Sequence, residues 1–141
     1  MLEEEHEVKR VIESPDLPHG IGPYSAGVVA GNLIFVAQGP IAPGSPEPVG
    51  STVEEQAQRT LENIELVLQH VGASRKDVVK VTVYLADLDG YVALNEIYAR
   101  FFRQDFPSRI VIEASRLPQG LLVEMEVVAI LPGDLDVRDG G

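Results

Sequence analysis

Residues 121–131 read Leu-Leu-Val-Glu-Met-Glu-Val-Val-Ala-Ile-Leu, and this stretch decides the fold. Successive residues of a β-strand point to opposite faces of a sheet, so one face of this strand is wholly apolar. The other face is mainly apolar but includes Glu124 and Glu126. A strand that is apolar on both faces needs a cover on each side. We expect helices to cover one face and another subunit of a closed homo-oligomer to cover the other.

The segments immediately upstream supply another strand, a turn and a helix. Residues 109–114 are β-rich, and Leu117-Pro118-Gln119-Gly120 forms a turn that leads into residues 121–131. The short turn predicts that these two strands pair with each other. Apolar residues recur at helical intervals from about Tyr91 to Arg103, which predicts a helix there.

Further upstream, the pattern predicts a strand, a long helix and a hairpin. Valines and a leucine alternate with polar residues over 78–86, which is typical of a half-buried strand. Ser51 and Thr52 each precede a glutamate by three residues, the spacing of a capping box. A helix is therefore expected to begin there and to end at Gly72, the residue best suited to a left-handed cap. Residues 28–37 predict a β-hairpin around Gly31-Asn32.

The order of the expected elements, β-β-α-β-α-β-β, favours an α+β fold with both helices on one face of the sheet. The 141 residues, 45% of them hydrophobic, support one globular domain. We place that domain at residues 14–131. Residues 1–13 and 132–141 are acidic and are expected to be flexible tails.

The net charge of −11 opposes binding to nucleic acid or to an anionic membrane surface. The N-terminus lacks the basic and then apolar segments of a signal peptide, and no apolar run is long enough to cross a membrane. The expected location is therefore the cytoplasm. The chain has no cysteine and no phosphate-binding or zinc-binding motif, so its residues indicate neither a cofactor nor a metal.

Two charged residues lie where a purely structural sequence would hardly place them. Arg109 begins one β segment, and Glu124 lies inside the apolar last strand. A buried guanidinium and a buried carboxylate destabilise a fold unless each is paired. The residues alone leave two interpretations open: the two side chains form a structural ion pair, or they bind a ligand.

Over residues 14–131 the chain resembles the RidA (YjgF) family of enamine and imine deaminases. The resemblance rests on five blocks of sequence. They are Ile21-Gly22-Pro23-Tyr24-Ser25; the strand from Asp77 to Leu85; Val92-Ala93-Leu94-Asn95-Glu96-Ile97-Tyr98 with Phe101-Phe102; Phe106-Pro107-Ser108-Arg109; and Leu117-Pro118-Gln119-Gly120 with Val123-Glu124-Met125-Glu126.

The resemblance implies a chorismate-mutase-like domain that assembles as a homotrimer, with the sheets lining a central barrel and the sites in clefts between subunits. It implies hydrolysis of 2-imino acids, which pyridoxal-phosphate enzymes release as enamines, to 2-keto acids and ammonia, without metal or cofactor. Arg109 would bind the substrate carboxylate through two hydrogen bonds, and Glu124 would activate water. Tyr24 and Asn95 would help to line the pocket.

The chain departs from the family pattern at two places. Ile110 and Val111 follow the arginine where active members commonly carry small residues, so contacts of Val111 with the substrate would use its backbone. Residues 37–41, Ala-Gln-Gly-Pro-Ile, replace the usual Ser-Gly-Gln-Ile-Pro loop.

Two other functions stay open: a non-catalytic trimer that binds small carboxylates as a regulator, and a chaperone-like partner protein.

Overall fold

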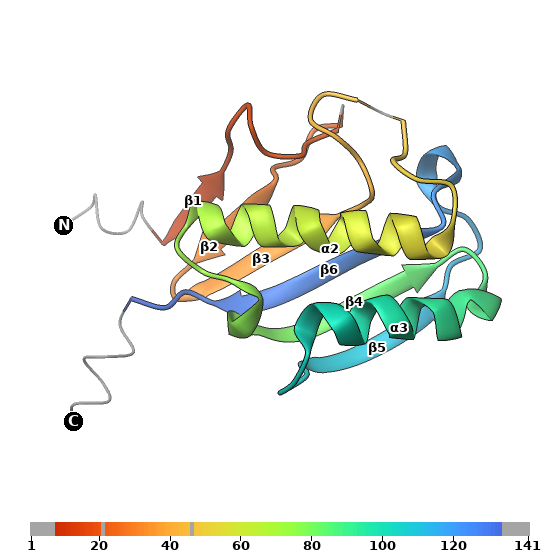
Figure 1. The fold of residues 1–141 in the computed structure, drawn as a ribbon. Helices are drawn as coiled ribbons and strands as arrows, with labels where there is room; N and C mark the ends of the chain where they lie inside the picture. Colours follow the sequence, from red (N-terminus) through yellow and green to blue (C-terminus); the bar gives the residue numbers. More distant parts are fainter. Residues whose placement is uncertain (1–7, 21, 46, 134–141) are drawn as a thin grey trace.

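A computed structural model describes residues 8–20, 22–45 and 47–133 of the chain. Six strands form one mixed sheet in the order β1-β2-β3-β6-β4-β5, and two helices lie on the same face of it (Figure 1). This arrangement confirms the expected α+β fold. The elements are β1 (Lys9–Ile12), β2 (Gly27–Ala30), β3 (Leu33–Gln38), α2 (Val53–His70), β4 (Val78–Leu85), α3 (Tyr91–Phe102), β5 (Ser108–Glu113) and β6 (Val123–Ile130).

The capping box at the start of α2 is formed by Thr52 and Glu55. The backbone N–H of Glu55 donates to the Thr52 hydroxyl at 3.1 Å, and the Glu55 carboxylate accepts from the backbone N–H of Thr52 at 3.3 Å. The Glu55 carboxylate also accepts from the backbone N–H of Ser51 at 2.8 Å, and the backbone hydrogen bonds from Ser51 and Thr52 lower the pKa of Glu55. At the other end, Gly72 has a φ of +84°, as the left-handed cap requires. The sequence prediction of both helix ends is confirmed.

The predicted pairing of residues 109–114 with residues 121–131 is wrong. Strand β5 pairs in parallel with β4, and β6 runs antiparallel between β3 and β4. Because α3 connects β4 to β5, these two strands form a β-α-β unit, in which the crossover makes the strands parallel. Residues 118–120 form a short 3-10 turn that begins a longer return to the middle of the sheet rather than a hairpin.

The N-terminal tail is shorter than the sequence indicated. Residues Lys9–Ile12 form β1, which pairs antiparallel with β2, and Ile12 is buried in the core. The segment Lys-Arg-Val-Ile is only four residues long and does not alternate in polarity, so its sequence resembled a solvated tail. The remaining tail predictions, for residues 1–7 and 134–141, lie outside the described residues.

The two faces of the sheet differ in exposure. On the face under the helices, Val123, Met125, Val127 and Ala129 of β6 are at most 2% exposed. The opposite face carries half-exposed or exposed side chains, among them Phe35 at 42% and Ile110 at 53%. Within the described residues, no helix is long and apolar enough to span a membrane. The uncovered apolar face is the feature from which the sequence predicted a second subunit, and that assembly stays a prediction.

Candidate active site

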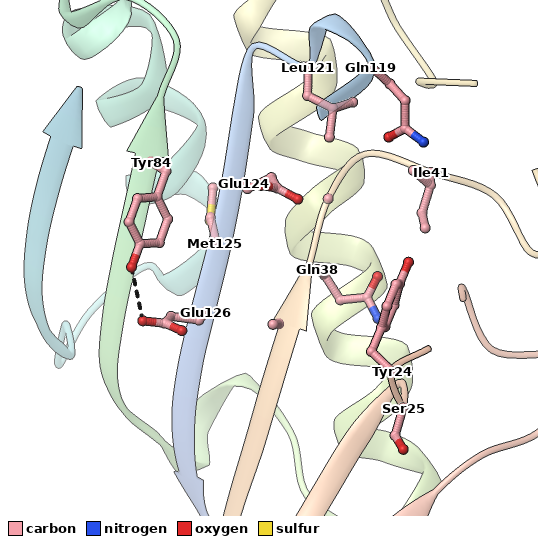
Figure 2. Close-up of a pocket in the computed structure, with 12 residues that line it drawn as sticks. Tyr24, Ser25, Gln38, Ile41, Tyr84, Gln119, Leu121, Glu124, Met125 and Glu126 are labelled. Carbon is pink, nitrogen blue, oxygen red and sulfur yellow. Dashed lines mark hydrogen bonds between the residues drawn. The ribbon is translucent and has the colours of Figure 1, made fainter. Parts of the chain in front are cut away.

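A cavity of about 350 Å³ lies on the uncovered side of the sheet, where β3 ends and β6 begins (Figure 2). It is lined by polar residues from four segments of the chain and by apolar side chains between them. The lining residues are Tyr24, Ser25, Ala37, Gln38, Gly39, Ile41, Tyr84, Gln119, Leu121, Glu124, Met125 and Glu126. Two of the five site residues predicted from the sequence, Tyr24 and Glu124, are therefore in one cavity.

Glu124 provides an unengaged carboxylate in this cavity. It lies opposite Tyr84 in the β4–β6 register and is partly buried, and its loss of solvation raises its pKa. Within residues 8–20, 22–45 and 47–133, no group donates a hydrogen bond to it. A Cβ atom on Gly39 would lie 3.6 Å from Glu124 Oε2, so the missing side chain of Gly39 keeps the space beside the carboxylate open.

The neighbouring acid on the same face, Glu126, is already engaged. The Tyr84 hydroxyl donates to Glu126 Oε2 at 3.2 Å, and Glu126 is exposed (Figure 2). Burial raises the pKa of Tyr84, and the hydrogen bond to the carboxylate raises it further. Of the two glutamates, Glu124 is therefore the better placed to act as a base toward a molecule in the cavity.

Tyr24 and Gln38 lie on the side of the cavity that faces the N-terminal segment (Figure 2). The Tyr24 hydroxyl accepts a hydrogen bond from the backbone N–H of Gly20 at 2.8 Å. Gln38 is 6% exposed, and its Nε2 donates to the carbonyl of Pro18 at 3.2 Å. Its Oε1 has no hydrogen-bond partner among the described residues. Thus residue 38, where the chain departs from the family's usual loop, adds a buried amide to the site.

Arg109 is outside this cavity and on the other face of the sheet. In the β4–β5 register it lies opposite Val81, whose side chain is buried under the helices. Its guanidinium carbon is 4.5 Å from the centroid of the Tyr98 ring and 5.7 Å from that of Tyr91, both on α3. Arg109 Nη2 donates to the Tyr91 hydroxyl at 3.4 Å. Among the described residues, no carboxylate forms an ion pair with Arg109.

The structural ion pair between Arg109 and Glu124 is therefore excluded within one chain. Strand β4 separates their strands, and the two side chains project from opposite faces. Of the two interpretations that the sequence left open, the ion pair within one chain is wrong, and ligand binding stays a prediction.

The other two predicted residues accompany Arg109. Asn95 shares a face of α3 with Tyr91 and Tyr98, because residues four and seven positions apart on a helix lie on one side. The Val111 side chain packs against the core. Because the Ala114 N–H donates to Leu85 of β4, the ladder's alternation turns the N–H and C=O of Val111 toward the free edge of the sheet. The five predicted residues thus form two groups on opposite faces.

Sequence reasoning missed the polar residues of α2 that hold the cavity loops in place. Asn63 is fully buried, and its Nδ2 donates to the carbonyls of Gly39 at 2.9 Å and Ile41 at 2.8 Å. Gln56 donates to the Gly50 carbonyl and accepts from the Leu122 N–H at 2.8 Å. Both residues fall on the apolar stripe of the helix, a position where a polar side chain signals a specific partner.

Among the described residues, no three His, Asp or Glu side chains are grouped as metal ligands would be.

Comparison with known proteins places the whole core of the chain in one family. The sequence profile described as Endoribonuclease L-PSP matches residues 15–131. A RutC family protein of Pyrococcus abyssi is 48% identical over 122 residues, which cover 86% of this chain and 96% of the relative. The human 2-iminobutanoate/2-iminopropanoate deaminase is 37% identical, with 87% and 90% covered. The crystal structure of Escherichia coli TdcF with bound serine superposes with a TM-score of 0.79 at 34% identity and covers 86% and 98%.

Proposed function

The chain belongs to the RidA (YjgF) family, whose profile carries the description Endoribonuclease L-PSP, and we propose that it hydrolyses 2-imino acids to 2-keto acids and ammonia. A deaminase is supported by two relatives, one named a reactive intermediate deaminase and the other a 2-iminobutanoate/2-iminopropanoate deaminase. The observation that carries the residue roles is that, among the described residues, Arg109 has no carboxylate partner and the partly buried Glu124 carboxylate accepts no hydrogen bond.

The proposed reaction needs one water and a base. The substrate carboxylate binds the edge of the Arg109 guanidinium through two parallel hydrogen bonds. Glu124 takes a proton from water as the oxygen attacks C2 of the protonated imine, which gives a carbinolamine. Glu124 returns that proton to the nitrogen, and the C–N bond breaks to release ammonia. The hydroxyl becomes the keto oxygen by giving its proton, through Glu124, to that ammonia. An iminium acid and water thus yield a keto acid and an ammonium ion.

The two groups can act together only if two copies of the chain meet. In one chain, Arg109 and Glu124 lie on opposite faces with a strand between them. Strand β5 is an edge strand, so Arg109 and the outward backbone groups of Val111 are accessible to a neighbour. We propose a homotrimer in which the cavity with Glu124 and Tyr24 in one subunit faces Arg109, Asn95 and Val111 of the next. The apolar uncovered face supports such an assembly.

The proposed substrate fits the size and charge of the site. A cavity of about 350 Å³ suits a small molecule. Leu121, Ile41 and Met125 offer apolar contacts to a short side chain. In the proposed trimer, Arg109 of the next subunit supplies the cation that binds the carboxylate. The amino acid bound in TdcF is also small and carries a carboxylate. The net charge of −11 makes RNA a poor ligand, although the family description names a ribonuclease.

An imine-decay assay tests the proposal. An amino-acid oxidase generates 2-iminopropanoate or 2-iminobutanoate, and the decay rate is measured with and without the protein. We expect acceleration by the wild type and a loss of at least ~100-fold in Glu124→Gln, the usual contribution of a general base. Arg109→Ala should lose turnover, and Arg109→Lys should recover little of it because one ammonium cannot form the paired contact.

Glu126→Gln is the matched control, because Glu126 is on the same strand and face. It should retain nearly full activity. Full activity of Glu124→Gln together with loss in Glu126→Gln would mean that the wrong carboxylate is assigned. A wild type that binds 2-oxobutanoate but never accelerates imine decay would instead identify a carboxylate-binding regulator.

A further inference from the structure

The Arg109 guanidinium rests on an aromatic surface built by α3, and we propose that this surface, the rings of Tyr98 and Tyr91, orients Arg109 to receive a carboxylate. Both tyrosines are then positioning residues that act through Arg109. This inference rests on the proposed function, because it assumes that Arg109 binds the substrate carboxylate. It adds the part of the chain that determines the direction of the guanidinium.

The inner ring is fixed by the core. Tyr98 is 5% exposed, and its ring centroid lies 4.7 Å from that of Phe102. Phe106, which precedes β5, stacks against Tyr98 at 6.5 Å with an interplanar angle of 26°. The side chain that supports Arg109 is therefore held on two sides. Tyr91, which is 41% exposed, closes the outer side and accepts the hydrogen bond from Arg109 Nη2.

Contact through the face of a guanidinium leaves its hydrogen-bonding edge free. All five N–H groups lie in the plane of the guanidinium, and an aromatic ring attracts the cation through the face. Only Nη2 donates to a residue among those described, and the bond to Tyr91 is long at 3.4 Å. The remaining N–H groups donate to no described residue, so they are available to a carboxylate, which needs two parallel hydrogen bonds.

A second arginine in the same protein shows what a purely structural version of this contact looks like. The guanidinium carbon of Arg75 lies 4.3 Å from the centroid of the Phe101 ring. Its Nε forms an ion pair with Glu65 at 2.9 Å, and its Nη1 donates to the Phe101 carbonyl at 2.8 Å. Arg75 thus has a ring, a carboxylate and a carbonyl. Arg109 contacts two rings and, among the described residues, no carboxylate. The carboxylate of a ligand can therefore bind Arg109 as Glu65 binds Arg75.

The ring of Tyr98, and not its hydroxyl, carries the proposed role. The Tyr98 hydroxyl is buried and has no hydrogen-bond partner among the described residues. Replacement of Tyr98 by Phe therefore keeps the aromatic surface and removes an unsatisfied buried group. Replacement by Leu removes the surface. The two substitutions separate the positioning role from the hydroxyl, and the exposed Tyr91 offers a site where folding is little affected.

The experiment compares wild type, Tyr98→Phe, Tyr98→Leu, Tyr91→Leu and Arg109→Ala by two measurements. The first is the NMR resonance of the Arg109 side-chain Nε–H, assigned by its absence in Arg109→Ala. The second is the Kd for 2-oxobutanoate, a keto acid that cannot turn over. We expect a ring-shifted Arg109 resonance and equal Kd values in wild type and Tyr98→Phe. Tyr98→Leu should raise Kd about tenfold, and Tyr91→Leu about threefold, as loss of a cation–π contact implies.

The outcomes distinguish the two proposals. If wild type binds the keto acid, Arg109→Ala does not, and Tyr98→Leu binds as tightly as Tyr98→Phe, the positioning role is overturned while the carboxylate anchor stands. If wild type does not bind the keto acid, the proposed function fails, and the role of the rings fails with it. Should Tyr98→Leu not fold, an unshifted Arg109 resonance in wild type, or unchanged binding in Tyr91→Leu, overturns the inference.

Discussion

Asn63→Ala removes the side chain that holds the loop beside Glu124, and the structure allows its cost to be worked out. Two hydrogen bonds are lost, each with a net contribution of ~1 kcal/mol. Each carbonyl keeps another donor, the Ile41 N–H for Gly39 and Arg59 Nε for Ile41, so no full penalty for an orphaned carbonyl is added. The emptied space costs about 1 kcal/mol. Removal of Asn63 Oδ1, which is buried without a partner among the described residues, stabilises the protein by about as much as the emptied space destabilises it.

The sum predicts that Asn63→Ala is destabilised by ~2 kcal/mol, or about 8 °C in Tm for a domain of this size. Thermal unfolding of the purified variant measures this, and 2-oxobutanoate binding should weaken as well because the loop is less ordered. Gln69→Ala is the matched control, because Gln69 is an exposed amide on the same helix. It should change stability by less than ~0.5 kcal/mol. A loss of ~2 kcal/mol should lower Tm by about 8 °C, so a Tm for Asn63→Ala within about 2 °C of that control would refute the reasoning.

Two further predictions concern the cavity. Because burial raises the pKa of Glu124, the folded state favours its neutral form, and the ionised carboxylate lowers stability above that pKa. Glu124→Gln should therefore have a higher Tm than wild type at pH 7. The gain in the free energy of unfolding should be less than ~1 kcal/mol, because solvent screens the exposed part of the group, and it should vanish below about pH 4. A lower Tm of the variant at pH 7 would contradict this. Gly39→Ala places a methyl group 3.3 Å from Leu121 Cδ1, which must shift, and in contact with Glu124 Oε2 at 3.6 Å. Because the methyl group fills the space beside the carboxylate where the substrate would bind, kcat should fall about tenfold while the fold persists, and an unchanged kcat would contradict this.

Local signals in the sequence predicted the elements well. The capping residues of α2 and its glycine end act within a few residues of each other, so their pattern is readable without the rest of the fold. The alternation of β6 is equally local, and its inner side chains are buried as expected. In β4, a register shift between Val78 and Lys80 buries Val78 and exposes Val79, where plain alternation predicted the reverse.

Relations between distant segments were the part that could not be predicted. Strand pairing depends on which edges remain free after the helices pack, and the short turn before β6 favoured a hairpin that the β-α-β unit prevents. The same error placed Arg109 beside Glu124. The family resemblance supplied both residues but not their separation onto opposite faces. The positions of Asn63 under the cavity loop and Tyr98 under Arg109 also depend on tertiary contacts.

Mixed assemblies test most directly the claim that the site is built from two subunits. Arg109→Ala and Glu124→Gln chains, each inactive alone, are co-refolded in equal amounts, and imine hydrolysis is measured. A site that takes Arg109 from one subunit and Glu124 from the next is intact at about a quarter of the interfaces of a randomly mixed trimer, so about a quarter of the wild-type rate should return. A mixture that stays as inactive as the separate variants, although its subunits have exchanged, would contradict the account.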